Sequence, residues 1–450
     1  MKFLLVFQIL VLGLMSAIVF LLDSIQLIYG LSIIIILIII CIQFLGKFKA
    51  RLILVWQGAF IYIVGLEGFV NHNEILVEYG NGAVYASQYI VATFFLSIIG
   101  YLIGYNLDNI KKNALNLTQT DHRTIEYKSS VFTVLFLIIM YCLFILLNFN
   151  NAIDSFYGGR NTQNFKADFS FLNSAINNTL SMTLPAIITF TFRYIYKIKN
   201  CILVSAFLSF PVFTILFLQG TRFTLLFSLA GLILVSIQNK KIKFKNIIYI
   251  ALIGFVTLYV GELMRDSRGI GIVNYLSSNG KQIKDSMIEL FYSKEGITGA
   301  MTMLIEYYEG DFNFHKYGAS TGFIFIFWIP RILWPDKPTM LGHWLIRELP
   351  GGGFSGGHSR SFGFAGDAYV DFGLIGGIVF ALIFGLFIQF LERRNKKIFI
   401  NNYNVLYIAI TYPFVFFAFR SLQTSFMNFL GMLVILWIFK KTLVTKNYKN

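Results

Sequence analysis

Residues 26–46 read QLIYGLSIIIILIIICIQFLG, and this stretch decides the class of fold because it contains no charged residue. A helix needs about 20 apolar residues to cross the hydrocarbon core of a bilayer. The stretch is therefore predicted to be a membrane-spanning helix, and the next question is how many similar runs the chain contains.

The composition of the whole chain points the same way. Of its 450 residues 56% are hydrophobic and only 13% are charged, and its mean hydropathy is +0.68. A soluble domain carries roughly 25% charged residues. The low charge and the 49 Phe and 24 Tyr residues exclude a soluble enzyme and a disordered chain. The three cysteines lie inside apolar runs, so a secreted disulfide scaffold is excluded as well.

Apolar runs of sufficient length occur throughout the chain. The fold class predicted is an all-α, polytopic integral membrane protein with about 12 transmembrane helices, at residues 3–22, 26–46, 52–71, 88–105, 130–149, 178–195, 201–218, 223–238, 246–263, 363–391, 403–418 and 424–439. The first run has no small-residue cleavage site after it, which favours a retained anchor. Residues 321–334 are apolar but short and contain Pro330, so we expect a re-entrant or interfacial segment there.

The basic residues give the orientation. With the N-terminus in the cytoplasm, the Lys- and Arg-rich stretches all fall on the cytoplasmic side, at 47–51, 111–128, 193–199, 240–245, 393–397 and 440–449. Cytoplasmic loops of membrane proteins collect Lys and Arg. We therefore expect both termini in the cytoplasm, and the net charge of +15 needs no nucleic-acid partner to explain it.

The expected organisation has three parts. Residues 1–263 would hold nine transmembrane helices, 264–362 one long extracytoplasmic loop, and 363–450 three more helices and a cytoplasmic tail. A loop of this length in a compact protein is usually functional. Within it, part of 281–309 has the spacing of an amphipathic helix lying along the outer surface, and the glycine-rich stretch 351–357 has the composition of a lid.

Cations gather on the expected outer side. A charge in or near the bilayer costs at least about 2.5 kcal/mol, so such residues are functional candidates. Arg222 and Arg420 have a plain alternative, in which they extend to the lipid headgroups. For Arg265 the alternative is a structural ion pair with Glu262 or Asp266. Because guanidinium groups bind phosphates in a bidentate manner, the set is predicted to bind a diphosphate: Arg222, Arg265, Arg331, Lys337, Arg360 and Arg420.

Aromatic side chains accompany these cations. Trp328, Trp334 and Trp344 lie in the same loop and offer flat apolar faces of the kind that stack on sugar rings. A glycan linked to a polyprenyl diphosphate would use the cations and the indole rings together. Asp367 and Asp371 follow on one helix face, where they have the spacing to pair with an arginine, bind a cation or accept from sugar hydroxyls.

Several short motifs carry a family resemblance over roughly residues 215–425. They are Gly220-Thr221-Arg222, Leu263-Met264-Arg265, Ala418-Phe419-Arg420, a loop glutamate at Glu295, and the segment from Ile329-Pro330 through Leu333-Trp334-Pro335-Asp336-Lys337-Pro338-Thr339-Met340. In these features the chain resembles the Wzy-type oligosaccharide repeat-unit polymerases, which build O-antigen, capsular and common-antigen polysaccharides.

The resemblance implies a bacterial inner-membrane glycosyltransferase with a GT-C-like fold and an extracytoplasmic active site. It would transfer a growing glycan from undecaprenyl diphosphate to a lipid-linked repeat unit and release undecaprenyl diphosphate. Glu295, His343, His358 and Asp367 compete for the role of catalytic base or orienting acceptor. No metal and no cofactor are expected. A flippase and a chain-length regulator are expected partners.

The sequence is compatible with three other functions. A ligase would hand the same lipid-linked glycan to another acceptor and would share donor and geometry with the polymerase. A flippase or other transporter fits twelve helices, but its site is expected near the membrane midplane, where this chain has few charges apart from Glu67. A passive scaffold in an export complex would not need aligned outer arginines.

Overall fold

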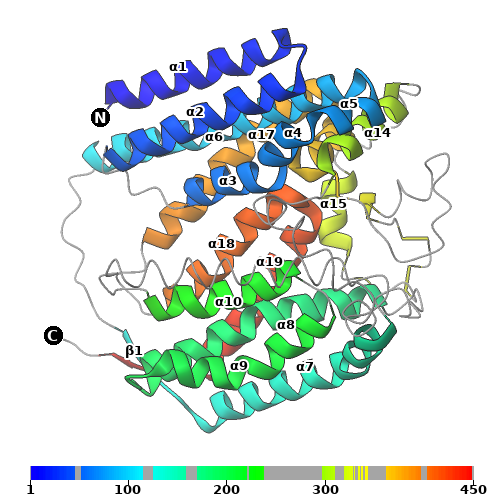
Figure 1. Ribbon diagram of the computed structural model, residues 1–450. Helices are drawn as coiled ribbons and strands as arrows, with labels where there is room; N and C mark the ends of the chain where they lie inside the picture. The colour runs from blue at the N-terminus through cyan, green and yellow to red at the C-terminus, as the bar shows by residue number, and fades with distance from the viewer. Residues whose placement is uncertain are drawn as a thin grey trace. The chain divides into compact units, whose positions relative to one another are not determined.

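The computed structural model describes residues 2–45, 52–114, 125–158, 170–219, 222–237, 296–309, 319–327, 329, 333–334, 336–337, 340–342, 361–396 and 403–447 (Figure 1). These residues are almost entirely helical. They divide into two compact units, and each is treated by itself below. The first unit takes its residues from 1–120, 291–394 and 414–426, and the second from 121–290, 395–413 and 427–450.

The helices confirm the predicted class of fold. Seven of the described helices are long and apolar enough to cross a membrane by length and composition, and shorter apolar helices accompany them. Every predicted span that falls within the described residues is helical, and only the span at 246–263 lies outside them. The chain is an all-α, polytopic integral membrane protein.

The first unit contains most of the N-terminal helices and the described part of the long loop. Its elements are α1 (Lys2–Ile18), the 3-10 turn η1 (Val19–Leu21), α2 (Ile25–Leu45), α3 (Leu52–Phe60), the π-helical η2 (Ile61–Gly65), α4 (Leu66–Val70), α5 (His72–Tyr79), α6 (Gly82–Ala114), α14 (Ile297–Glu309), α15 (Ala319–Ile326) and α17 (Gly363–Lys396). Helices α1 and α2 run alongside the long α6 (Figure 1).

Trp56 is the centre of the first unit's core. The side chain is fully buried, and rings of Phe94, Phe364 and Phe419 surround it at centroid distances of 6.4, 5.4 and 4.9 Å. Its indole N–H donates to Ser97 Oγ at 2.7 Å, which satisfies its single polar group. Aromatic packing therefore ties α3 and α6 to chain segments more than 250 residues later.

Glycines bring α6 and α17 into backbone contact. A Cβ added at Gly100 would lie 2.1 Å from the carbonyl oxygen of Leu382, and one added at Gly385 would lie 1.9 Å from that of Ser97. Gly100 and Gly104 have the small-x-x-x-small spacing that allows close helix contact in lipid. Apolar burial gives no net drive between helices in lipid, so this close van der Waals contact is a main source of their association.

Helix α17 departs from the predicted single span at 363–391. Gly373 has φ +67° and ψ −168°, which breaks the helix after residue 372. Phe364 stacks on Phe380 with ring centroids 5.8 Å apart, although a straight helix would separate these residues by about 24 Å. The first half-helix, 363–372, therefore folds back against the second, and the prediction of one continuous span was wrong. Hydropathy is the same for a straight and a folded apolar run.

Helix α14 corrects a second expectation. The helical spacing predicted within 281–309 is confirmed from Ile297 onward. However, Ile297, Ala300, Met301, Leu304 and Ile305 are all buried, and α14 packs on α6 and α5. The described part of this segment is thus a core helix of the first unit, whereas an amphipathic surface helix was expected.

The second unit is a bundle with a small sheet. It contains β1 (Ile125–Lys128), α7 (Val131–Gly158), α8 (Ser170–Phe190), the π-helical η4 (Thr191–Ile195), α9 (Cys201–Leu218), α10 (Arg222–Ile237) and β2 (Val444–Asn447). Strands β1 and β2 pair antiparallel, with Ile125 opposite Asn447. Two further helices, α18 (Asn404–Arg420) and α19 (Leu422–Thr442), contribute residues to both units.

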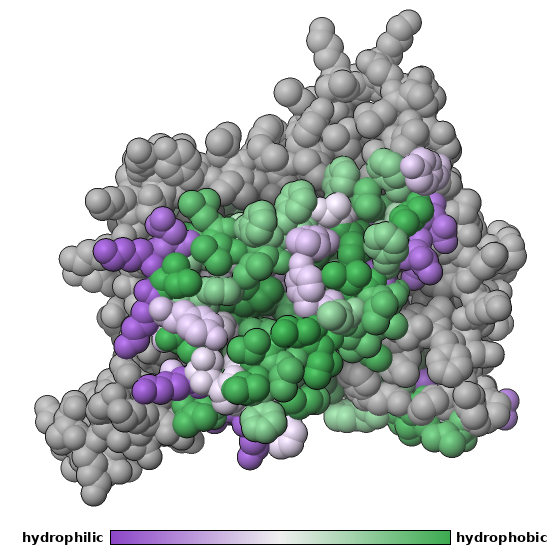
Figure 2. Space-filling view, turned by 90° about the horizontal axis from the view of Figure 1, so that it is seen from below, coloured by the Kyte–Doolittle hydropathy of each residue, from purple (hydrophilic) through white to green (hydrophobic). Residues whose placement is uncertain are grey.

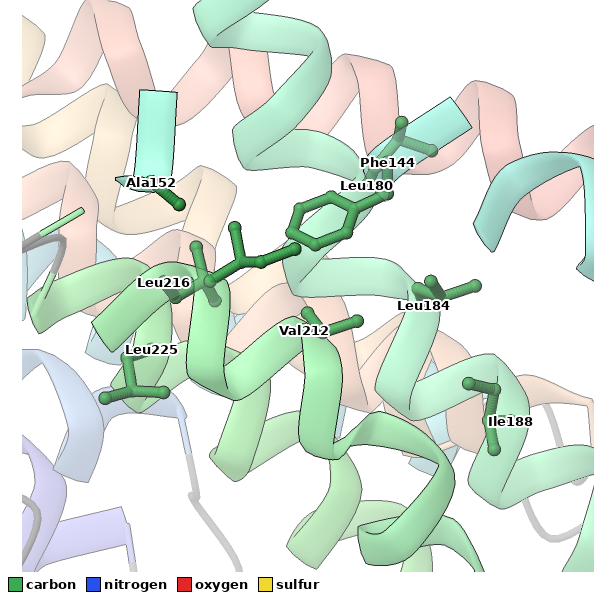
Figure 3. Close-up of a cluster of buried hydrophobic side chains, with 9 residues drawn as sticks. Phe144, Ala152, Leu180, Leu184, Ile188, Val212, Leu216 and Leu225 are labelled. Carbon is green, nitrogen blue, oxygen red and sulfur yellow. The ribbon is translucent and has the colours of Figure 1, made fainter. Parts of the chain in front are cut away.

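One hydrophobic cluster holds α7, α8, α9 and α10 together. Figure 3 shows side chains from all four helices converging on it, among them Phe144, Leu180, Val212, Leu216 and Leu225. Outside this core, α7 and α9 carry exposed apolar side chains such as Phe132 and Phe207. Among the residues coloured by hydropathy in Figure 2, most are apolar. Such surfaces fit a chain whose solvent is lipid.

The glycine contact between α6 and α17 yields a stability prediction. Gly385→Ala should lower the free energy of unfolding by about 3 kcal/mol, because the new methyl group overlaps a backbone carbonyl that cannot rotate away. Gly58→Ala is the matched control, since a Cβ there meets nothing within 4 Å. Thermal unfolding in detergent measures both, and equal melting temperatures for the two variants would contradict the contact.

Candidate functional site

The folded-back half-helix 363–372 carries the first candidate residue, Asp367. Its side chain is buried, and the backbone N–H of Leu422 donates to its Oδ2 at 2.9 Å. Leu422 is the first residue of α19, so its N–H has no partner within that helix. The carboxylate caps α19 and also meets the positive end of the helix dipole.

Asp371 does the same for another helix. It is fully buried one turn further along the half-helix, and its Oδ2 accepts from both the backbone N–H (2.6 Å) and the hydroxyl of Thr321, in the first turn of α15. The prediction that the two aspartates share a helix face fits this arrangement, since both project from one half-helix to neighbouring helix starts. α15 is thus fixed at its N-terminal end.

Lys337 fixes the other end of α15. Its side chain is buried, and its ammonium donates to the carbonyl oxygens of Phe327 (3.0 Å) and Ile329 (2.7 Å), just past the end of α15. A cation at a helix C-terminus satisfies carbonyls that lack an intrahelical partner. This geometry gives Lys337 a structural task that competes with its predicted role as a diphosphate ligand.

Arg420 lies at the junction between two helices. It is the last residue of α18, only Ser421 separates it from α19, and its guanidinium carbon is 5.4 Å from the Phe417 ring centroid. Two other segments reach this junction. Asp367 caps α19 there, and the backbone N–H of Leu341 donates to Gln423 Oε1 at 3.3 Å. The candidate cation thus sits where the half-helix, the late part of the long loop and the α18–α19 turn meet.

Two more buried carboxylates repeat the capping pattern. Glu67 Oε1 accepts from the N–H of Gly296, immediately before α14, at 3.1 Å. Glu392 Oε2 accepts from the N–H of Leu52, the first residue of α3, at 2.7 Å. Every acidic side chain that is buried in the described part of the chain therefore contacts the start of another helix.

The Gly220-Thr221-Arg222 turn belongs to the second unit. Arg222 is the first residue of α10, and its side chain lies outside what the structure describes. The residues on either side of the turn are anchored. Gln219 Nε2 donates to Asn148 Oδ1 at 2.9 Å, and Thr224 Oγ1 donates to Asn178 Oδ1 at 3.4 Å. Hydrogen bonds to α7 and α8 therefore position both flanks of the turn.

The remaining candidates are distributed as follows. Trp334 is described and is 38% exposed, so part of its side chain is accessible. The other predicted residues fall outside the described part of the chain: Arg265, Glu295, Trp328, Arg331, His343, Trp344, His358 and Arg360. The structure thus brings Asp367, Lys337 and Arg420 into one connected network in the first unit, and Arg222 belongs to the second.

The comparison with known families identifies the chain. It matches the sequence model of the O-antigen polysaccharide polymerase Wzy family over residues 2–447, which is nearly its full length. The chain belongs to the Wzy O-antigen polysaccharide polymerase family. The resemblance inferred from the motifs is thereby confirmed. No curated protein and no solved structure shows significant similarity to it.

Sequence reasoning missed the capping partners of the carboxylates. Glu67 and Glu392 contact residues more than 200 positions away, and no local pattern predicts such pairs. The folded-back half-helix did leave a signal, since Gly363 and Gly373 both have positive φ and bracket it. Glycine adopts positive φ without steric cost, so two glycines ten residues apart allow the chain to turn sharply at both ends of the segment between them.

Substitution of Asp367 separates a capping role from a catalytic one. Asp367→Asn keeps an oxygen that accepts from Leu422 N–H, so polymer formation by this Wzy family member should stay within about threefold of wild type. Asp367→Ala removes the cap and should cost about 1–2 kcal/mol of stability together with most activity. Polymer gels and melting temperatures report both effects. An inactive but fully stable Asn variant would show that Asp367 acts as the base.

Lys337 gives a second prediction. Lys337→Met should lower the free energy of unfolding by about 1–3 kcal/mol, because two carbonyls lose a charged donor in a buried place. Thermal unfolding of the purified variant measures this loss. An unchanged melting temperature combined with loss of polymer would restore Lys337 as a diphosphate ligand.

Proposed function

We propose that this chain polymerises oligosaccharide repeat units carried on undecaprenyl diphosphate, at the outer face of the bacterial inner membrane. The observation that carries the proposal is Arg420, a cation held at the junction of α18 and α19 in a chain that belongs to a polymerase family. The expected outer position of this junction follows from the distribution of Lys and Arg along the sequence.

The proposed reaction is a glycosyl transfer. A hydroxyl oxygen of the acceptor repeat unit forms a bond to the anomeric carbon of the donor's reducing-end sugar, while the bond from that carbon to the diphosphate oxygen breaks. The electron pair of the broken bond leaves with undecaprenyl diphosphate, and the hydroxyl proton passes to a base. The growing chain is thereby joined to the acceptor repeat unit, which stays attached to its own lipid carrier.

The cations would stabilise the leaving diphosphate. Negative charge develops on the bridging oxygen as the bond breaks, and fixed guanidinium groups in a site of low polarity stabilise it without reorganisation. We assign this role to Arg420, and the sequence names Arg222, Arg265, Arg331 and Arg360 as further candidates for it. Charge stabilisation of this kind needs no metal, and a GT-C-like, metal-independent transferase is the mechanism we propose.

The base is sought among four residues. Asp367 already accepts a hydrogen bond at the start of α19, so its carboxylate is engaged in holding the junction. Its proposed role is to position Arg420 by fixing the helix that follows. Glu295, His343 and His358, all in or next to the long loop, then remain as candidates for receiving the hydroxyl proton.

Reconstitution tests the proposal. The purified chain in nanodiscs, given its cognate undecaprenyl-diphosphate repeat unit without nucleotide sugar or added metal, should form a ladder of polymer on a gel. Arg420→Ala should reduce the rate by about 100-fold or more, because it removes a charge that stabilises the leaving group. An equal loss of rate in Arg222→Ala would give Arg222 the same role. Arg394→Ala, at an exposed position near the end of α17, is the control and should leave the rate unchanged.

Two outcomes would contradict the proposal. Movement of the lipid-linked repeat unit across a vesicle bilayer without any ladder would identify a flippase. Transfer of the glycan to a different acceptor, again without a ladder, would identify a ligase. Melting temperatures of the arginine variants show whether a loss of rate reflects unfolding.

A further inference from the structure

A group of uncharged polar side chains gathers at one end of the α7–α10 bundle. It consists of Asn148 on α7, Asn177 and Asn178 on α8, Gln219 after α9 and Thr224 on α10, and we call it the amide rim. Two hydrogen bonds join rim members in pairs, from Gln219 to Asn148 at 2.9 Å and from Thr224 to Asn178 at 3.4 Å, and Asn177 precedes Asn178 in α8. The Gly-Thr-Arg turn lies between Gln219 and Thr224 in the chain, so it joins the two pairs.

The floor beneath the rim is apolar. Phe144, Leu180, Leu216 and Leu225 lie within four residues of rim members and belong to the hydrophobic cluster of Figure 3. The rim is therefore a polar layer resting on a tightly packed base, which keeps its side chains in fixed positions. The rim side chains are amides and a hydroxyl, so they carry no charge. The basic residues at 193–199 lie at the opposite end of α8.

Asn177 leaves one strong acceptor unused. Its Oδ1 atom is buried and has no hydrogen-bond partner among the described residues. A buried carbonyl without a donor is costly, and such atoms in native proteins call for an explanation. A bound group that donates a hydrogen bond to this oxygen would explain why no side chain does so.

We propose that the amide rim binds hydroxyl groups of the sugar attached directly to the lipid diphosphate. This inference rests on the proposed function and names a part of its substrate site. Amide side chains both donate and accept, which matches sugar hydroxyls, whereas a deprotonated phosphate has no proton to give to Asn177 Oδ1. Arg222 and Thr224 both lie in the first turn of α10, so this helix end carries a candidate diphosphate ligand and a rim residue.

Binding measurements on the full chain in nanodiscs test the inference. The two probes are undecaprenyl diphosphate without sugar and the lipid-linked repeat unit extracted from a strain that lacks this polymerase. Asn177→Ala should weaken binding of the glycan-bearing probe by about 5- to 10-fold, as expected for one lost hydrogen bond, and should change binding of the sugar-free probe by less than about twofold. Arg222→Ala should weaken both.

Two further variants complete the test. Thr224→Val preserves the shape of a second rim residue and should reproduce the selective loss. Asn200→Ala removes an exposed amide at the other end of α9, where it makes no side-chain capping bond, and should change neither affinity. Unchanged melting temperatures establish that Asn177→Ala and Thr224→Val are folded.

The outcomes separate this inference from the proposed function. Equal binding of both probes by wild type, or equal effects of the rim variants on both probes, would overturn the sugar site even if the wild-type chain forms a polymer ladder. Selective loss of glycan binding together with no ladder from wild type would uphold the rim and overturn the polymerase reaction.

Discussion

Buried carboxylates bound to the first turns of distant helices are the interaction on which the first unit depends. Within hydrocarbon, no water satisfies the free N–H groups at a helix start, and an ionised carboxylate equally needs donors. Glu67, Asp367, Asp371 and Glu392 solve both problems at once, because each contacts the start of another helix. Each contact also joins segments that are at least 50 residues apart.

This arrangement has a direct consequence for function. Asp367 and Asp371 project from one short half-helix, so the half-helix links the start of α19 to α15, whose other end Lys337 holds. Arg420 stands two residues before the capped Leu422. A charge in a membrane protein is useful for catalysis only if its position is fixed. In the proposed mechanism, the carboxylates provide that rigidity.

The parts of the fold that follow from local composition were predictable from the sequence. Runs such as 26–46 and 201–218 are helical as predicted, because a bilayer leaves the backbone few alternatives. Whether the chain continues straight through an apolar run or reverses within it was not predictable, because hydropathy is the same in both cases. Residues 363–391 look like one span by hydropathy, yet the chain folds back at Gly373.

The candidate site was predictable only as residue types. Cations beside Gly and Pro turns pointed to a diphosphate, and the family to which the chain belongs agrees with a polymerase. The pattern did not separate a cation that binds a ligand from one that caps a helix. Lys337 looked like Arg420 in the sequence, but its ammonium donates to carbonyls at the end of α15. Such partners depend on tertiary contacts that no local motif encodes.

A density map of the full chain in nanodiscs with undecaprenyl diphosphate bound would show whether Asp367 positions Arg420 against the diphosphate. We expect phosphate density within hydrogen-bonding distance of the Arg420 guanidinium, with the Asp367 carboxylate still accepting from the N–H of Leu422. Phosphate density remote from Arg420, or an Asp367 side chain that has left α19 to contact the ligand, would contradict it.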